Sequence, residues 1–190
     1  MALPVLQYDG PIHLVAAEPG LQRALHDIRQ ERVIGFDTET RPSFRKGQSH
    51  NPSLVQIATA HAVHLFQLAR LDCSQVLTEI FANPDIRKVG VALVRDLADL
   101  KRLFPFEPAN LLDLGDIVKR HGYTQSGVRN LTGLFLGARI TKGARTTNWA
   151  NVNLTTAQIR YAATDAWVCR ELYLHFEKLG LLNLPAKPGR

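Results

Sequence analysis

The chain has 190 residues, enough for one sizeable domain and short for two. Hydrophobic residues make up 45% and charged residues 21% of the composition, which predicts a globular protein and argues against a disordered one. The formal net charge of +6 favours an anionic partner, with nucleic acid ahead of a membrane surface.

The sequence predicts a cytoplasmic protein. No apolar stretch approaches the ~20 residues that a membrane span needs. Residues 1–10 contain no basic segment followed by an apolar block, so a secretory signal is not expected. Cys73 and Cys169 are far apart in the sequence, as is common for packing residues in a reducing compartment.

Strand and helix patterns alternate along the chain and predict an α/β protein. The predicted strands, in order, are 12–15, 33–37, 54–59, 63–66, 86–91 and 111–113. The predicted helices are 18–29, 74–82, 93–104, 114–121, 127–136 and 155–178. A polar, basic segment at 41–52 is expected to be a mobile loop, with Arg41, Arg45 and Lys46 steering a nucleic-acid strand.

These elements predict a mixed central sheet flanked by helices in a single domain, 1–190. No internal repeat, low-complexity block or linker interrupts the chain. The core should run from about residue 12 to residue 178, and a flexible tail is expected at 185–190.

Several helix ends have clear signals in the sequence. Thr155 and Gln158 match a capping box at the start of the last long helix. Asp113 and Ser126 are predicted to cap the two helices before it, and Gly137 is predicted to end the second of these.

Two carboxylates follow the predicted buried strand 33–37. Side chains alternate along a strand, so Asp37 and Glu39 should point to the same side and Thr38 to the other. Two acidic groups on one face repel each other and lose hydration. A divalent cation between them would relieve both costs, so this strand end is a candidate metal site.

Two further acidic positions fall on helices. Tyr161 and Asp165 are four residues apart in the last long helix and therefore share one of its faces. Small neighbours, Ala162, Ala163 and Ala166, would let this helix approach the sheet closely. Asp96 lies in the first turn of the predicted helix 93–104, where the helix dipole favours a carboxylate.

The ordered set of these motifs resembles the DnaQ-like 3′–5′ exonuclease superfamily in its DEDDy branch, and within it the chain most resembles ribonuclease D and the exonuclease domain of the Werner syndrome helicase. The matching segments are VIGFDTE, SLVQIAT with VHLFQL, RKVGVALVRDLADL and TTNWANVNLTTAQIRYAATDAWVCRELY. The resemblance runs from about residue 12 to 176 and implies a ribonuclease H-like fold.

The resemblance also implies roles for individual residues. Four carboxylates match the family's metal-binding set, and Tyr161 matches the residue that orients the attacking water; the carboxylates are Asp37, Glu39, Asp96 and Asp165. A member of the alternative branch would have a histidine at position 160, where this chain has Arg160. Many relatives carry an asparagine four residues before the acid of the second motif, and here that residue is Ala92.

The implied activity is metal-dependent 3′–5′ exonuclease hydrolysis of DNA or RNA by a two-metal-ion mechanism that releases 5′-mononucleotides. Four carboxylates would roughly neutralise two Mg²⁺ or Mn²⁺ ions, and hard oxygen ligands favour these metals over zinc. Thr38, Lys142, Arg145 and Trp149 are candidate substrate-binding residues. Two other readings stay open: a non-catalytic nucleic-acid-binding module on the same fold, and a protein-interaction scaffold.

Overall fold

The computed structural model describes residues 2–43, 45, 47 and 49–183. The predictions for Lys46 and for the tail at 185–190 therefore concern residues outside the described part. Within it the strands are β1 (Ile12–Val15), β2 (Val33–Thr40), β3 (Pro52–Ala58), β4 (Val63–Gln67), β5 (Arg87–Gly90) and β6 (Leu111–Asp113). The helices are α1 (Glu18–Arg29), α2 (Ser74–Ala82), α3 (Leu93–Leu103), α4 (Leu114–Arg120), α5 (Val128–Leu136) and α6 (Thr156–Lys178).

The strands form one mixed sheet in the order β1-β4-β3-β2-β5-β6. Strand β2 pairs antiparallel with β3 and parallel with β5, which places it inside the sheet with neighbours on both sides. Strands β3 and β4 pair antiparallel as a hairpin, and β1 pairs parallel with β4 at one edge. The mixed α/β sheet predicted from the sequence is therefore confirmed.

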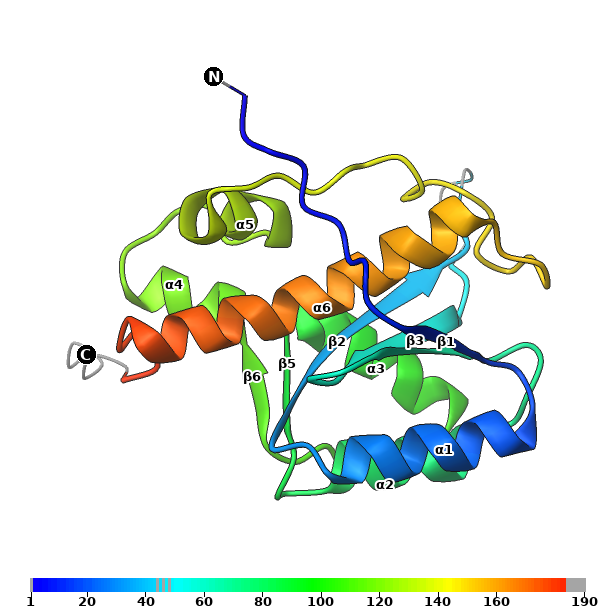
Figure 1. Ribbon diagram of the computed structural model, residues 1–190. Helices are drawn as coiled ribbons and strands as arrows, with labels where there is room; N and C mark the ends of the chain where they lie inside the picture. Colours follow the sequence, from blue (N-terminus) through cyan, green and yellow to red (C-terminus); the bar gives the residue numbers. More distant parts are fainter. Residues whose placement is uncertain (1, 44, 46, 48, 184–190) are drawn as a thin grey trace.

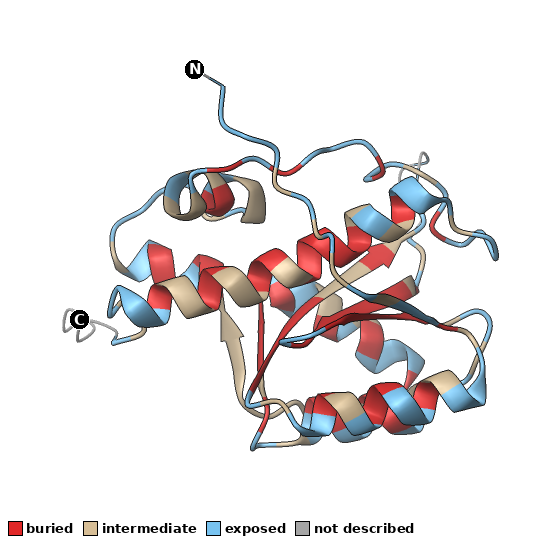
Figure 2. Cartoon of the chain, viewed as in Figure 1, coloured by how far each residue is buried: buried red, intermediate tan, exposed pale blue. Residues whose placement is uncertain are grey.

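Helices cover both faces of the sheet (Figure 1). Helices α1 and α2 lie below it, and α6 crosses above it, in contact with β2, β3, β4 and β5. Colouring by burial shows the inner strands and the sheet-facing side of α6 as buried, whereas the outer side of α1 is exposed (Figure 2). Cys73 and Cys169 are both buried and unbonded, as expected of packing residues.

Helix α6 approaches β2 unusually closely at Gly35. A Cβ atom added at Gly35 would lie 2.0 Å from the carbonyl oxygen of Ala166 and 2.9 Å from the backbone nitrogen of Arg170. Ala162, Ala163 and Ala166 are fully buried on the facing side of the helix. Small residues on both elements thus bring α6 down onto the strand that ends in Asp37 and Glu39.

We therefore expect Gly35→Ala to destabilise the protein by about 1–3 kcal/mol or more, because the added methyl group collides with backbone that cannot move freely. Urea denaturation would measure the loss. Gly143→Ala is the matched control, since nothing lies within 4 Å of a Cβ at Gly143. Equal stability of Gly35→Ala and the wild-type protein would show that the close approach is not needed.

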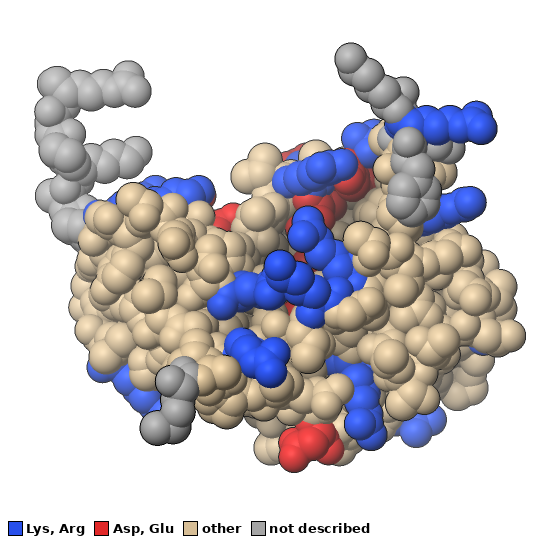
Figure 3. Space-filling model, turned by 90° about the horizontal axis from the view of Figure 1, so that it is seen from above, with Lys and Arg blue, Asp and Glu red and all other residues tan. Residues whose placement is uncertain are grey.

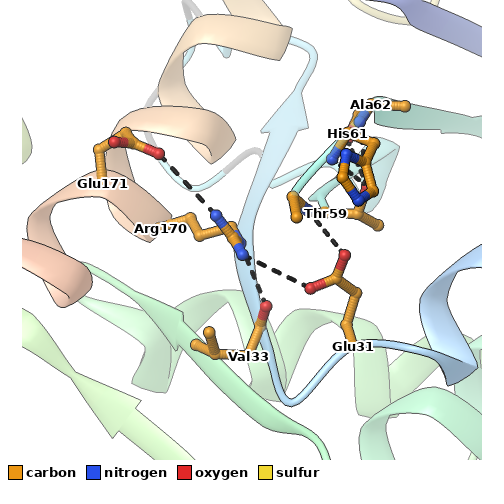
Figure 4. Close-up of polar contacts among 8 residues, drawn as sticks. Glu31, Val33, Thr59, His61, Ala62, Arg170 and Glu171 are labelled. Atoms are coloured by element: carbon orange, nitrogen blue, oxygen red, sulfur yellow. Dashed lines mark hydrogen bonds and ion pairs between the residues drawn. The ribbon is translucent and has the colours of Figure 1, made fainter.

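A polar network also ties α6 to the start of β2 (Figure 4). The Arg170 guanidinium donates to the backbone carbonyl of Val33 at 3.3 Å and pairs with Glu31 at 3.5 Å. Glu31 in turn accepts a 2.7 Å hydrogen bond from the backbone nitrogen of Ala60, in the turn between β3 and β4. Arg170 and Glu31 are both largely buried, so this network fixes how α6 crosses the sheet.

The helix ends confirm most of the capping signals and correct one. Thr155 and Gln158 form the capping box at the start of α6, and Gly137 ends α5 in the left-handed conformation. Ser126 does not cap α5: the N-cap residue is Gly127, with no side-chain hydrogen bond. The serine lies one residue too early for its hydroxyl to take that position.

Asp113 has a larger role than the predicted cap. One carboxylate oxygen accepts hydrogen bonds from Gly115 and Asp116 at the start of α4, and the other accepts one from the backbone nitrogen of Leu93, 2.9 Å away, at the start of α3. The N-cap of α3 is Ala92, in the left-handed region at φ 61° and without a side-chain cap. Asparagine tolerates this conformation better than alanine, which gives a physical reason for an asparagine at this position in relatives.

Candidate active site

Three of the predicted carboxylates converge where β2 meets α6. Asp37, Glu39 and Asp165 each offer an oxygen atom, and these atoms all lie within 4.8 Å of one another. Glu39 and Asp165 are 9% and 5% exposed. Strand alternation brings the first two to one face of β2, and the close packing of α6 brings the third to the same place.

Asp96 lies beside this cluster but points to another partner. Its Oδ1 atom accepts a 2.8 Å hydrogen bond from the Thr38 hydroxyl. This bond holds Asp96 next to the end of β2, and Asp96 is not part of the three-carboxylate group. The Thr38 side chain, a candidate for substrate contact, is thus engaged with Asp96, although it also lines the cavity described below.

Burial and mutual repulsion make the carboxyl groups hard to ionise. Burial raises the pKa of Asp37 well above its usual range, and Asp165 and Asp96 raise it further. The same effects raise the pKa of Glu39 to about 10. Burial raises the pKa of Asp165 to about 7 and that of Asp96 to about 6. The protein by itself does not supply enough positive charge to balance these carboxyl groups when they are ionised.

Tyr161 lies one turn before Asp165 on α6, and its hydroxyl group opposes the rise in the pKa of Asp165. The tyrosine ring packs against the Trp149 ring, with 6.0 Å between their centroids. Trp149 is only 2% exposed, so it supports Tyr161 from behind and is closed to a stacked base. The buried, large apolar ring has the position of a core residue, and the substrate contact of Trp149 stays a prediction.

The cluster opens into a cavity of about 650 Å³. Figure 3 shows Lys and Arg side chains gathered around this recess, with acidic atoms visible between them. The cations that line it are Arg129, Arg139, Lys142 and Arg145. Lys142 and Arg145, both predicted substrate contacts, are exposed at its rim. The cavity thus has carboxylates at its base and cations at its edge. This arrangement suits a polyanion whose phosphate is neutralised by metal ions.

The residues present fit a divalent cation. Three carboxylate oxygens within 4.8 Å of one another form a hard oxygen donor set, the type that Mg²⁺ and Mn²⁺ prefer. A cation there would also offset the repulsion that raises the pKa values of Asp37 and Glu39. Asp96, held by Thr38, would be the nearest further carboxylate.

Two further residues of the cavity, Arg129 and Arg139, carry no functional signal in the sequence. Arg129 lies in the first turn of α5, and Arg139 lies just after that helix. A single arginine at a helix start looks like an ordinary surface residue. Only the packing of α5 over α6 brings Arg129 to the carboxylates, and the sequence contains no local signal of that contact.

Among the described residues, no helix is both long and apolar enough to cross a bilayer.

A family model described as 3′-5′ exonuclease matches residues 12–180. An exonuclease mut-7 homolog from Aedes aegypti is 29% identical to this chain over 88% of its length, and a putative 3′-5′ exonuclease from Acanthamoeba polyphaga mimivirus is 31% identical over 86%. The chain spans only 26% and 45% of the length of these relatives.

Solved structures share the fold. The Nibbler EXO domain from Aedes aegypti matches 96% of this chain, and 95% of its own, with a TM-score of 0.83 and 23% identity. Escherichia coli RNase D matches 90% of this chain, and 46% of its own, with a TM-score of 0.78 and 23% identity. At this level of identity the likeness supports the arrangement of sheet and helices, including the placement of α6 over β2.

Proposed function

The chain belongs to the 3′-5′ exonuclease family, and on this basis we propose that it hydrolyses the last phosphodiester bond at the 3′ end of DNA or RNA with the help of divalent cations. The observation that carries the proposal is the convergence of Asp37, Glu39 and Asp165 at the floor of a cavity with a basic rim. Hydrolysis at phosphorus develops negative charge, and this site concentrates groups that can balance it.

The residues divide the chemistry among them. Asp37, Glu39 and Asp165 would hold Mg²⁺ or Mn²⁺, and Asp96 would serve as a fourth ligand. When bound there, two such ions would lower the pKa of the attacking water and stabilise charge on the leaving oxygen. The Tyr161 hydroxyl orients the water. The water oxygen bonds to phosphorus, the bond from phosphorus to the 3′ oxygen breaks, and the leaving oxygen takes up a proton.

The products of this reaction are a 5′-mononucleotide and a chain one residue shorter with a free 3′-hydroxyl. Lys142 and Arg145 at the rim contact the phosphates of the incoming strand, since both are exposed beside the acidic floor. Steering by these cations would make binding strongly salt dependent.

A non-catalytic binding module is the second candidate. It would keep the basic rim and need no acidic floor. The presence of Asp37, Glu39, Asp96, Tyr161 and Asp165 together favours catalysis, because three buried carboxylates that repel one another are costly in a fold that makes no use of them.

Matched 3′-recessed DNA and RNA oligonucleotides, labelled at the 5′ end, test the proposal. We expect a ladder that shortens from the 3′ end with Mg²⁺ or Mn²⁺ and no degradation with EDTA. The relative rates on the two substrates identify the preferred nucleic acid. Binding of both oligonucleotides by the folded protein without degradation, with either metal, would support the binding module instead.

A further inference from the structure

Arg129 differs from the other three cations of the cavity in its surroundings. Lys142 and Arg145 are exposed at the rim, and Arg139 is exposed and donates from Nε to the backbone carbonyl of Leu3 at 3.1 Å. Arg129 is half-buried, and its Nε atom is sealed from solvent with no hydrogen-bond partner in the part of the chain that the structure describes. A guanidinium with no hydrogen bond or ion pair in this part of the chain has an unpaired charge, so we expect an anion to meet it from the cavity that Arg129 lines.

The position of Arg129 indicates where that acceptor would lie. Arg129 lies in the first turn of α5, which packs against α6. Its side chain lines the same cavity as Asp37, Glu39 and Asp165. It is close enough to Asp165 to lower that group's pKa. The Arg129 side chain therefore lies in the acidic site, and Arg145 at the rim is likewise near enough to Glu39 to lower that group's pKa.

Charge balance identifies the chemistry of the missing acceptor. In the proposed function, four carboxylates carry four negative charges that two divalent cations cancel. The positive charge of Arg129 is then left over and would be repelled by the ions. The phosphodiester that enters this site supplies one negative charge and oxygen acceptors in the fork geometry that a guanidinium favours.

We propose that Arg129 is a catalytic residue that donates hydrogen bonds to a non-bridging oxygen of the phosphate under attack and, after cleavage, to the 5′-phosphate of the released mononucleotide. This inference rests on the proposed function and adds to it a cation supplied by α5. During hydrolysis the charge on this oxygen increases, and a donor already in place would stabilise it without reorganisation.

Two measurements on Arg129→Gln test the inference. We expect kcat on a 5′-labelled oligonucleotide to fall ~10²-fold, the cost of removing one strong donor to the reacting group. We also expect affinity for 5′-AMP and 5′-dAMP in the presence of Mn²⁺ to fall roughly tenfold, whereas the affinity for adenosine does not change. Arg129→Lys should recover part of both losses because it keeps the positive charge. The recovery is only partial because lysine lacks the paired N–H donors of a guanidinium.

Arg120→Gln is the matched control, since Arg120 is exposed at the end of α4 and does not line the cavity. The mononucleotide measurement separates contact with phosphate from an indirect effect, because a residue that only tuned Asp165 would alter Mn²⁺ affinity and leave the preference for 5′-AMP over adenosine intact. If Arg129→Gln fails to fold, Arg129→Lys with unchanged kcat and unchanged 5′-AMP affinity overturns the inference.

The two proposals fail in different ways. Wild-type protein that degrades oligonucleotides, together with a folded Arg129→Gln variant of equal kcat and equal 5′-AMP affinity, would reject the role of Arg129 and leave the exonuclease assignment standing. Wild-type protein that leaves every oligonucleotide intact would reject both.

Discussion

Asp37→Asn is expected to lower the exonuclease rate by at least ~2–3 orders of magnitude and to make the metal-free protein more stable. The rate should fall because the substitution removes one negative charge from the group that holds the metal, a loss comparable to that of a strong electrostatic stabiliser. Stability should rise because burial and the neighbouring acids raise the pKa of Asp37 well above its usual range, so the neutral amide avoids that repulsion.

Initial rates with Mn²⁺ and melting curves in EDTA at pH 8 would measure the two effects. A gain of roughly 2–4 °C corresponds to about 1 kcal/mol in a domain of this size. Asp116→Asn is the control, since Asp116 is an exposed carboxylate paired with Lys119 outside the cavity. Near-wild-type turnover of Asp37→Asn would reject the assigned role of this residue.

The second large effect is a pH-dependent stabilisation by divalent metal. A carboxyl group with a raised pKa in the folded state contributes stability that is complete below its unfolded pKa of about 4. That contribution declines as pH rises through about 6 for Asp96, about 7 for Asp165 and about 10 for Glu39. The metal-free protein should therefore lose this contribution progressively above pH 4.

Divalent metal binds the ionised carboxylates, so its stabilising effect should grow over the same pH range. At a metal concentration about 100 times Kd the gain is about 2.7 kcal/mol. Thermal melts with Mg²⁺ and Mn²⁺ at pH 5.5 and pH 8, on wild type and on Asp37→Asn, test this. We expect the larger shift at pH 8 in the wild type and a much smaller shift in the variant. Equal shifts at both pH values and in both proteins would place metal binding elsewhere.

Local sequence signals predicted the elements that build the site. The apolar run ending in Asp37 and Glu39 gave β2, and the capping box at Thr155 gave the start of α6. Tyr161 and Asp165 share a face of that helix by simple periodicity. Gly35 and the facing alanines explain how these two elements come together, and only the alanines were recognised from the sequence as a close-packing signal.

Features that depend on long-range packing were not predictable in the same way. Strand alternation placed Thr38 away from Asp37, but only the position of α3 reveals that its hydroxyl bonds Asp96. Trp149, beside a run of cations, is a predicted substrate-binding residue, and only the packing of the chain reveals that its ring is buried against Tyr161. Arg129 reaches the site through the packing of α5 on α6, which no short motif encodes.

Hydrolysis in ¹⁸O-labelled water tests whether this protein is a metal-dependent 3′–5′ exonuclease. Wild-type protein, Mn²⁺ and a preferred oligonucleotide are incubated, and the released products are identified by mass spectrometry. We expect 5′-mononucleotides, each with one ¹⁸O atom in its phosphate, released in order from the 3′ end and absent when EDTA is present. Internal fragments, 3′-phosphorylated mononucleotides or metal-independent release would contradict it.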